Sequence, residues 1–265
     1  MCDLVVVGPS PLELCFGDLP RVPRPGEELL CRQLDIRPRS AALTALAAGR
    51  LSLRTALWSP FADDFPGRYL KGLLADGGVR WLGPVASRSA VLVDFGRECG
   101  TGITVEADGV PARPALDEAP PRAVAAGLDA LGSVPSGACG YAIAGGDGTL
   151  ADLERAPVRA LLAAAPAAVR LAGGDPADDP EAVIDAAHRL AAACELVVVD
   201  RGAEGALAVG AGEVTEITGA PAGRHPAHLA HSLFLAAYLW GDLHGLPLSE
   251  RLRWATLHAA RGDLP

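Results

Sequence analysis

A run of β-branched residues ending in glycine opens this chain: residues 3–8 read DLVVVG. A strand that is buried on both faces has such a continuous apolar pattern, because neither side of it meets water. Similar strand patterns recur at residues 54–60, 78–84, 139–146 and 195–200. Helical patterns fall between them at residues 41–51, 67–76 and 179–193. This alternation predicts an α/β fold with a mainly parallel central sheet that is covered by helices.

The alanine-rich middle of the chain and two strand-only stretches complete the expected organisation. Residues 121–131 and 151–165 have the composition of helices, and residues 167–174 (AAVRLAGG) look like a strand. Residues 13–37 and 87–109 interrupt the βα rhythm with strand patterns alone. We therefore expect one domain over residues 1–265, with a small β lid contributed by these two stretches.

Charge and cysteine content narrow the class of protein. The net charge of −9 argues against a nucleic-acid partner, which would favour a basic face. The longest apolar runs are too short or too interrupted to cross a membrane, and the first residues lack the pattern of a signal peptide. The six cysteines are scattered without a CxxC pair. We therefore expect reduced thiols and a cytoplasmic location, with no disulfide framework or zinc site.

Residues 195–241 contain the most informative order of motifs. Their pattern predicts, in chain order, a buried strand, a glycine turn, a hairpin and a long apolar helix. Two earlier segments add to this pattern, RVPRPGEELL (21–30) and FADDFPGRYLKGLLADGGV (61–79). Together the motifs resemble the ribokinase (PfkB) family of carbohydrate and nucleoside kinases over most of the chain. The resemblance implies a ribokinase-like three-layer sandwich with a mainly parallel sheet, flanking helices and a small β lid.

The resemblance also implies a substrate site. Glu13 follows Gly8 by five residues and corresponds to the family's sugar-binding aspartate, with one more methylene. Arg39 and Ser40 stand at the family's paired glycines, and Thr44 stands at the asparagine of the same motif. We expect the side chains of Arg39 and Ser40 to fill space that a sugar would occupy and to exclude a backbone with positive φ.

A nucleotide site is implied at the glycine turn after residues 195–200. Asp200 falls where the family has a threonine, so its carboxylate would face the polyphosphate. Gly202 and Gly205 are in register with the glycines of this turn, although a tight connection between two strands explains them better than ATP binding. Asp63 and Asp64 belong to the 61–79 motif, and we expect them to form loop and helix-cap hydrogen bonds.

The largest departure from the family falls at the start of the long helix. Family members open this helix with Gly-Ala-Gly-Asp, whose N–H groups hold the transferred phosphate and whose carboxylate takes the substrate proton. Here these positions read LAHS, so Ser232 stands at the catalytic aspartate and His231 precedes it. Either side chain could act as a substitute base, but serine is a poor base and the sequence shows no acid to orient His231. The Asn-x-x-Glu motif that organises magnesium is not found.

These losses together predict a protein that no longer transfers phosphate. We expect it to be a binding or interaction protein for a sugar- or nucleoside-like metabolite, without a cofactor. The alternative is an active, divergent sugar or nucleoside kinase that uses ATP and Mg²⁺ and a displaced acid. A third hypothesis assigns metal-dependent chemistry to His225, His228 and His231, although no carboxylate or cysteine lies nearby at ligand spacing. Because lids in this family often pair two protomers, the resemblance also implies a homodimer through the lid.

Overall fold

A nine-stranded sheet forms the centre of the computed structural model, which describes residues 2–96, 102–107, 120–146, 148–175, 179–221 and 226–262. The strand order is β13-β12-β11-β10-β9-β8-β1-β4-β5. The strands are β1 (Leu4–Val7), β4 (Thr55–Trp58), β5 (Arg80–Trp81), β8 (Ala123–Gly127), β9 (Cys139–Ile143), β10 (Ala160–Ala164), β11 (Leu196–Asp200), β12 (Gly205–Gly210) and β13 (Glu213–Thr218). Neighbouring strands are parallel except around β12, which runs antiparallel to β11 and β13.

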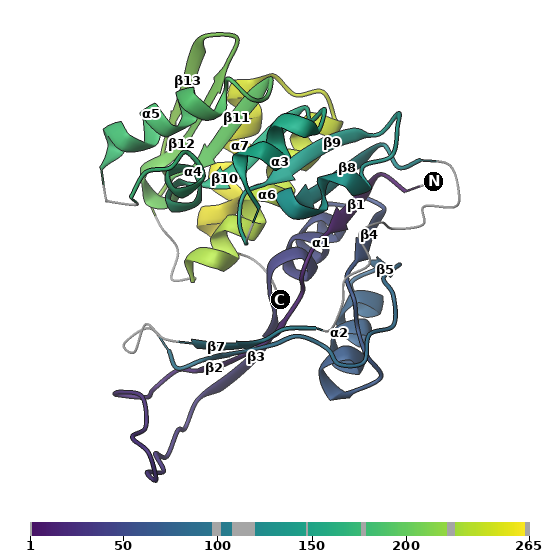
Figure 1. Ribbon diagram of the computed structural model, residues 1–265, viewed down its shortest axis with the longest axis vertical. Coiled ribbons are helices and arrows are strands. Elements are labelled where there is room, and N and C mark those ends of the chain that lie inside the picture. The colour runs from purple at the N-terminus through teal and green to yellow at the C-terminus, as the bar shows by residue number, and fades with distance from the viewer. Residues whose placement is uncertain are drawn as a thin grey trace.

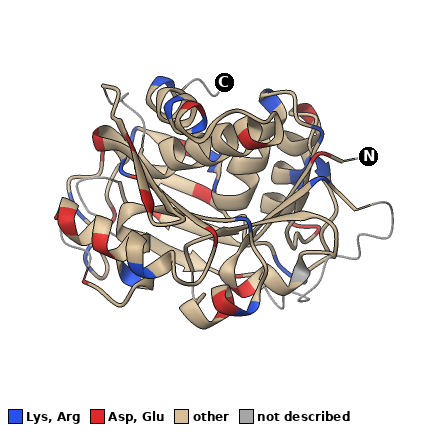
Figure 2. Cartoon of the chain, turned by 90° about the horizontal axis from the view of Figure 1, so that it is seen from above, with Lys and Arg blue, Asp and Glu red and all other residues tan. Residues whose placement is uncertain are grey.

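Helices cover both faces of this sheet (Figures 1 and 2). One face carries α1 (Ser40–Arg50), α2 (Phe65–Asp76), α6 (Ala227–Leu243) and α7 (Leu248–Arg261). The other carries α3 (Leu150–Arg155), α4 (Ala165–Leu171), α5 (Pro180–Leu190) and the 3₁₀ turn Leu128–Ser133. Within β1, Leu4 and Val6 pack into the first layer while Val5 and Val7 pack into the second. Every residue of the strand is therefore apolar, and the predicted α/β fold class is confirmed.

A second sheet of four strands lies below the central sheet in Figure 1. Its strands, in spatial order, are β3 (Leu34–Pro38), β2 (Leu12–Phe16), β6 (Val91–Asp94) and β7 (Gly102–Val105). They come from the two stretches that we expect to form the lid, of which residues 97–101 and 108–109 lie outside the described residues. We call this sheet the lid below.

The two faces of the lid differ in chemistry. Residues paired in register share a face, and one face is apolar in all four strands. It includes Leu14 on β2, which pairs with Ile36 on β3 and with Val93 on β6, and Ile103 on β7, which pairs with Val93. On the opposite face, Glu13 pairs with Arg37.

The alanine-rich segments differ from the sequence prediction. The helix expected at residues 121–131 is strand β8 followed by the 3₁₀ turn, and the helix expected at 151–165 is α3 followed by strand β10. The strand expected at 167–174 is helix α4. Ala123 to Ala126 are fully buried between the two helical layers. Small side chains let those helices approach the sheet, so burial outweighs the high helix propensity of alanine.

A buried ionic network lies at the C-terminal end of α6. Asp242 on α6 accepts a hydrogen bond from the hydroxyl of Tyr141 on β9. It also contacts Arg159 (Nε to Oδ2, 2.7 Å) and Arg251 of α7 (Nη1 to Oδ1, 2.6 Å). Burial raises the pKa of Tyr141 above its usual range, and the hydrogen bond with Asp242 raises it further. This network ties α6 and α7 to the sheet.

The distribution of charge and the character of the helices bear on whether the protein binds nucleic acid or spans a membrane. Acidic and basic positions are interspersed around the part of the chain that the structure describes (Figure 2). Among those same residues, no helix combines the length and the apolar character that crossing a membrane requires.

Candidate functional site

The candidate site lies at the carboxyl ends of the parallel strands. The lid lies beneath these ends in Figure 1. In open α/β sheets, ligands bind outside these ends where the strand order reverses. Here the reversal is at β1, because the chain runs from β1 to β4 on one side and later returns to β8 on the other. Gly8 and Glu13 follow β1, and Asp200 ends β11. The first turns of α1 and α6 begin at the same edge. We call this region the crevice.

Glu13 is fully buried and is surrounded by positive groups. Its carboxylate contacts Arg39 through Oε1, and Arg37 (Nε to Oε2, 2.8 Å) and His228 (Nε2 to Oε2, 3.3 Å) through its second oxygen. Burial alone would raise the pKa of Glu13, but the interactions with His228, Arg39 and Arg37 outweigh it and lower this pKa to about 2. Glu13 is therefore ionised and already engaged by other side chains of the protein.

A second pair links β11 to α6. The Nδ1 atom of His231 lies 2.9 Å from Oδ2 of Asp200, while Oδ1 of Asp200 accepts the backbone N–H of Gly202 at 2.9 Å. When His231 donates Nδ1–H to this carboxylate, its Nε2 atom is left as a proton acceptor. Asp200 is thus the orienting acid that the sequence did not reveal, because it lies 31 residues from His231. Ser232, the next residue of α6, is buried.

The Arg39–Ser40 turn keeps an unusual backbone conformation. Ser40 has φ of 52°, in the left-handed region that a glycine adopts without cost. The expectation that side chains here exclude positive φ is therefore wrong for Ser40. Arg39 turns its guanidinium to Glu13, and the hydroxyl of Thr44 donates to the carbonyl of Ser40 at 3.3 Å. Thr44 thus serves the first turn of α1.

The glycines of the β11–β12 connection have different structural roles. Gly205 has φ of 104°, and a Cβ atom there would lie 2.0 Å from the carbonyl oxygen of Ile217. Gly202 has φ of 60° and starts the 3₁₀ turn Gly202–Glu204, with open space where a Cβ would be. Gly205 is therefore required by close packing against β13, as a tight strand connection predicts.

The acids at residues 63 and 64 act locally. Asp64 caps α2 by accepting the N–H of Gly67 at 2.8 Å, and it also accepts the N–H of Ser89 at 2.8 Å. Asp63 forms a surface ion pair with Arg68. The predicted helix-cap role of Asp64 is confirmed.

Two histidines near the start of α6 contact different acidic side chains. His228 reaches Glu13 on the lid, and His231 reaches Asp200 on β11. His225 lies outside the described residues. Within the described ranges, no group of three His, Cys, Asp or Glu side chains is placed to hold a metal ion. Glu13 and Asp200 are thus each paired with side chains of the protein.

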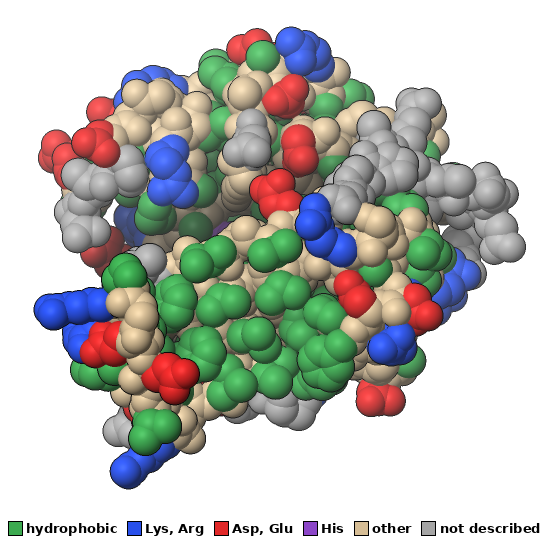
Figure 3. Space-filling model, turned by 60° about the horizontal axis from the view of Figure 1, so that its bottom comes forward, with side chains coloured by type: hydrophobic (Ala, Val, Ile, Leu, Met, Phe, Trp, Pro, Cys, Tyr) green, Lys and Arg blue, Asp and Glu red, His purple; other side chains and the backbone are tan. Residues whose placement is uncertain are grey.

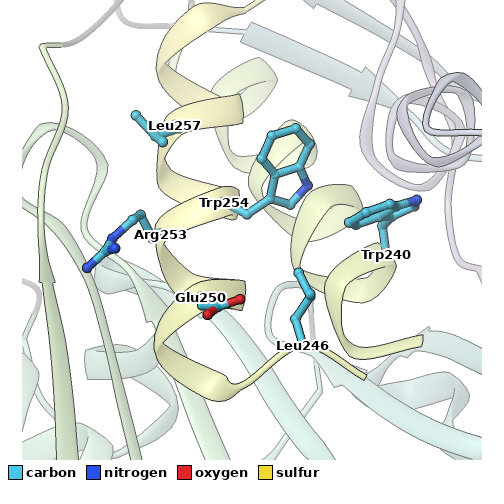
Figure 4. A pocket seen from close by; sticks show the side chains of 6 residues that line it. All are labelled: Trp240, Leu246, Glu250, Arg253, Trp254 and Leu257. Atoms are coloured by element: carbon cyan, nitrogen blue, oxygen red, sulfur yellow. The ribbon is translucent and has the colours of Figure 1, made fainter. Parts of the chain in front are cut away.

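A groove of about 290 Å³ lies elsewhere, at the other end of α6 (Figure 4). It is lined by Trp240, Leu246, Glu250, Arg253, Trp254 and Leu257. Trp240 is nine residues after His231, about 13 Å along the helix axis. The two tryptophan rings lie 5.8 Å apart. This groove is separate from the crevice.

Comparison with solved structures agrees with the fold described above. Ribokinase from Arabidopsis thaliana, solved with ribose and ATP, has 19% sequence identity to this chain and a TM-score of 0.76, covering 98% of this chain and 91% of its own. The tetrameric inhibited form of phosphofructokinase-2 from Escherichia coli has 17% identity and a TM-score of 0.74, with 98% and 93% covered. Ribokinase from Cryptococcus neoformans var. grubii, solved with ADP, has 18% identity and a TM-score of 0.72, with 98% and 93% covered.

Comparisons by sequence do not identify a family for this chain. No protein-family model matches the chain, and a search of curated proteins gives no significant match. The likeness is therefore one of structure, and it extends over nearly the whole chain. The chain has the fold of the ribokinase and PfkB kinases, as its motifs predict.

Proposed function

We propose that this ribokinase-like protein has lost phosphoryl transfer and binds a sugar- or nucleoside-like metabolite in the crevice. The observation that carries the proposal is the state of Glu13, which is buried and held by Arg37, Arg39 and His228. An acid that grips substrate hydroxyls must present its oxygens to them. Here the protein has supplied its own partners to that acid.

The start of α6 supports the same conclusion. Ser232 replaces the carboxylate that the family uses as base, and it is buried. Loss of a general base alone typically costs about 10²–10⁴-fold in rate. Asp200 is committed to His231 and to the N–H of Gly202, so it is not free to hold a metal ion beside a polyphosphate. We propose accordingly that the protein uses neither ATP nor Mg²⁺.

The test is a titration of the purified protein with Mg²⁺–ATP, combined with an assay for ADP release over a panel of sugars and nucleosides. We expect no micromolar binding of the nucleotide and no turnover. In a thermal-shift screen of the same panel, a binding metabolite raises the melting temperature, because ligands stabilise the native state by mass action. Micromolar Mg²⁺–ATP binding with turnover would overturn the proposal.

The Asp200–His231 pair favours a second candidate, an active and divergent sugar or nucleoside kinase. In that case His231 Nε2 takes the proton from the substrate hydroxyl, and Asp200 orients the ring and stabilises its charged form. Turnover would then be lost in His231→Ala and would fall strongly in Asp200→Asn. It would persist in His188→Ala, which changes an exposed histidine on α5. Absence of turnover in the unaltered protein across the panel rules this candidate out.

We also propose that a second copy of the chain covers the apolar face of the lid. Ile103 and Val105 on β7 are 57% and 43% exposed, and Leu34 and Ile36 on β3 are 49% and 38% exposed. Figure 3 shows a broad hydrophobic face on the bottom of the molecule. Contiguous apolar surface of this kind marks an interaction site. A two-fold axis through it would bury the same patch of both copies.

A further inference from the structure

Three buried polar atoms in the Glu13 cluster lack a directed hydrogen bond. They are Oε2 of Glu13, Nε of Arg37 and Nε2 of His228. The two nitrogens lie 2.8 Å and 3.3 Å from the carboxylate oxygen, close enough for charge attraction. The three atoms therefore meet one another, and charge attraction rather than well-directed hydrogen bonds holds this part of the cluster together.

The cluster also carries more positive than negative charge. Glu13 is ionised and supplies one negative charge, while Arg37 and Arg39 supply two positive charges. Asp35 and Asp94 lie on the same lid face, each paired with Cys15, one pleat repeat farther along the strand. Neither of these two acids forms an ion pair with Arg37 within the part of the chain that the structure describes. The two guanidinium groups thus outnumber the one carboxylate that they contact.

The arginines have donors to spare. A guanidinium carries five N–H donors, and Arg39 contacts Glu13 through Nη1 while Arg37 approaches it through Nε. The side chains of Arg37 and Arg39 are 25% and 27% exposed, whereas Glu13 is completely buried. The unused donors can thus meet a ligand from the solvent side. The planar fork of arginine matches the oxygens of a carboxylate or a phosphate.

We propose that the ligand of the crevice carries an anionic group, a carboxylate or a phosphate ester, and that Arg37 and Arg39 bind it. This inference rests on the proposed metabolite-binding function and adds the charge of the metabolite to it. The cluster then selects an acidic polyol over its neutral counterpart.

The test compares matched pairs of probes by isothermal titration. Gluconate is compared with glucose, ribose 5-phosphate with ribose, and inorganic phosphate is titrated alone. We expect one charged probe to bind at least tenfold more tightly than its neutral partner, and this preference to weaken as salt is raised from 50 to 500 mM. The gluconate and ribose 5-phosphate arms distinguish a carboxylate from a phosphate ester.

Variants connect the preference to the two arginines. In Arg37→Gln we expect the charged and neutral probes to bind within about twofold of each other. Arg32→Gln removes an exposed lid arginine outside the cluster and should leave the preference unchanged. For Arg39 the single variant Arg39→Gln is used, because Arg37 and His228 remain to compensate the buried charge of Glu13.

The outcomes separate this inference from the proposed function. Equal or tighter binding of the neutral probes overturns the inference while the binding function stands. Retention of the charge preference in Arg37→Gln also overturns it, as does a failure of every anionic probe to bind. ADP release from Mg²⁺–ATP, measured separately, overturns the loss of phosphoryl transfer and says nothing about the charge of the ligand.

Discussion

At the scale of single residues, Glu13 shows how a buried charge can be made stable. Its folded-state pKa of about 2 lies below the ordinary value of 4.5. A lowered carboxylate pKa contributes stability that is present above pH 4.5 and is lost as the pH falls toward 2. The shift corresponds to roughly 3 kcal/mol in the free energy of unfolding. This contribution must disappear when the carboxylate is removed.

We therefore predict that Glu13→Gln is less stable than the unaltered protein at pH 7 by about 3 kcal/mol. The difference should shrink as the pH is lowered from 4.5 to 2.5, because the unaltered protein loses the same contribution by protonation. Urea unfolding followed by circular dichroism at several pH values measures both. Glu154→Gln, an exposed acid on α3, is the control and should change stability by less than about 0.5 kcal/mol. A pH-independent difference would contradict the assignment.

The two glycines of the β11–β12 connection give a second residue-scale prediction. Gly205→Ala should lower the free energy of unfolding by about 3 kcal/mol or more, because a Cβ would overlap the carbonyl oxygen of Ile217 and the backbone has positive φ. Gly202→Ala meets no atom within 4 Å and should cost only about 1 kcal/mol for its positive φ. Chemical denaturation of both variants measures the two costs. Equal costs would show that the β13 contact is not what requires Gly205.

Residue-scale features of the crevice were only partly predictable. The motifs indicated that Glu13, Arg39, Asp200 and His231 belong to one region. The side chains that pair with these residues could not be predicted, because each pair joins elements that are distant in sequence. The Asp200–His231 pair spans 31 residues, and His228 reaches Glu13 across more than two hundred. The left-handed φ of Ser40 was predicted wrongly for another reason, since a serine in place of a glycine suggested that positive φ was excluded.

At the scale of elements, patterns with β-branched residues were assigned correctly, whereas alanine-rich strands were mistaken for helices. Strands β1 and β11 contain valine runs that are typical of buried strands. Strands β8 (AVAAG) and β10 (ALLAA) are just as buried, but alanine has high helix propensity and no strand signature. Only the burial of these segments between two helical layers decides their conformation, and a local pattern does not contain that information.

The lid yields the element-scale prediction. If a second copy covers its apolar face, Ile103→Lys should convert a dimer into a monomer, because a charge would be buried at the interface without a partner. Sedimentation velocity at micromolar concentration measures the assembly. Val214→Lys on β13 is the control, since Val214 is equally apolar and 43% exposed but lies outside the lid. A monomeric unaltered protein, or dimers in both variants, would contradict the proposed interface.

At the scale of the whole molecule, α6 connects two ionic clusters with different tasks. Its first turns carry His228 and His231 at the crevice, while Asp242 near its last turn holds Tyr141, Arg159 and Arg251. The two ends are separated by eleven residues from His231, about 16 Å along the axis. Among the described residues, none of the hydrogen bonds or ion pairs of Asp242 reaches Glu13, Asp200 or the two histidines. Stability and ligand binding should therefore be separable along this helix.

Asp242→Asn tests that separation. Removing the charge leaves Arg251, which is 15% exposed, without its counter-ion, and we expect a loss of about 3 kcal/mol in the free energy of unfolding. The dissociation constant of a crevice ligand, measured at a temperature where the variant is still folded, should change by less than twofold. Asp185→Asn, an exposed acid on α5, is the matched control and should alter neither quantity. Weaker binding by fully folded Asp242→Asn would contradict this separation. It would mean that the ionic network at the C-terminal end of α6 also stabilises the ligand-binding arrangement of the crevice.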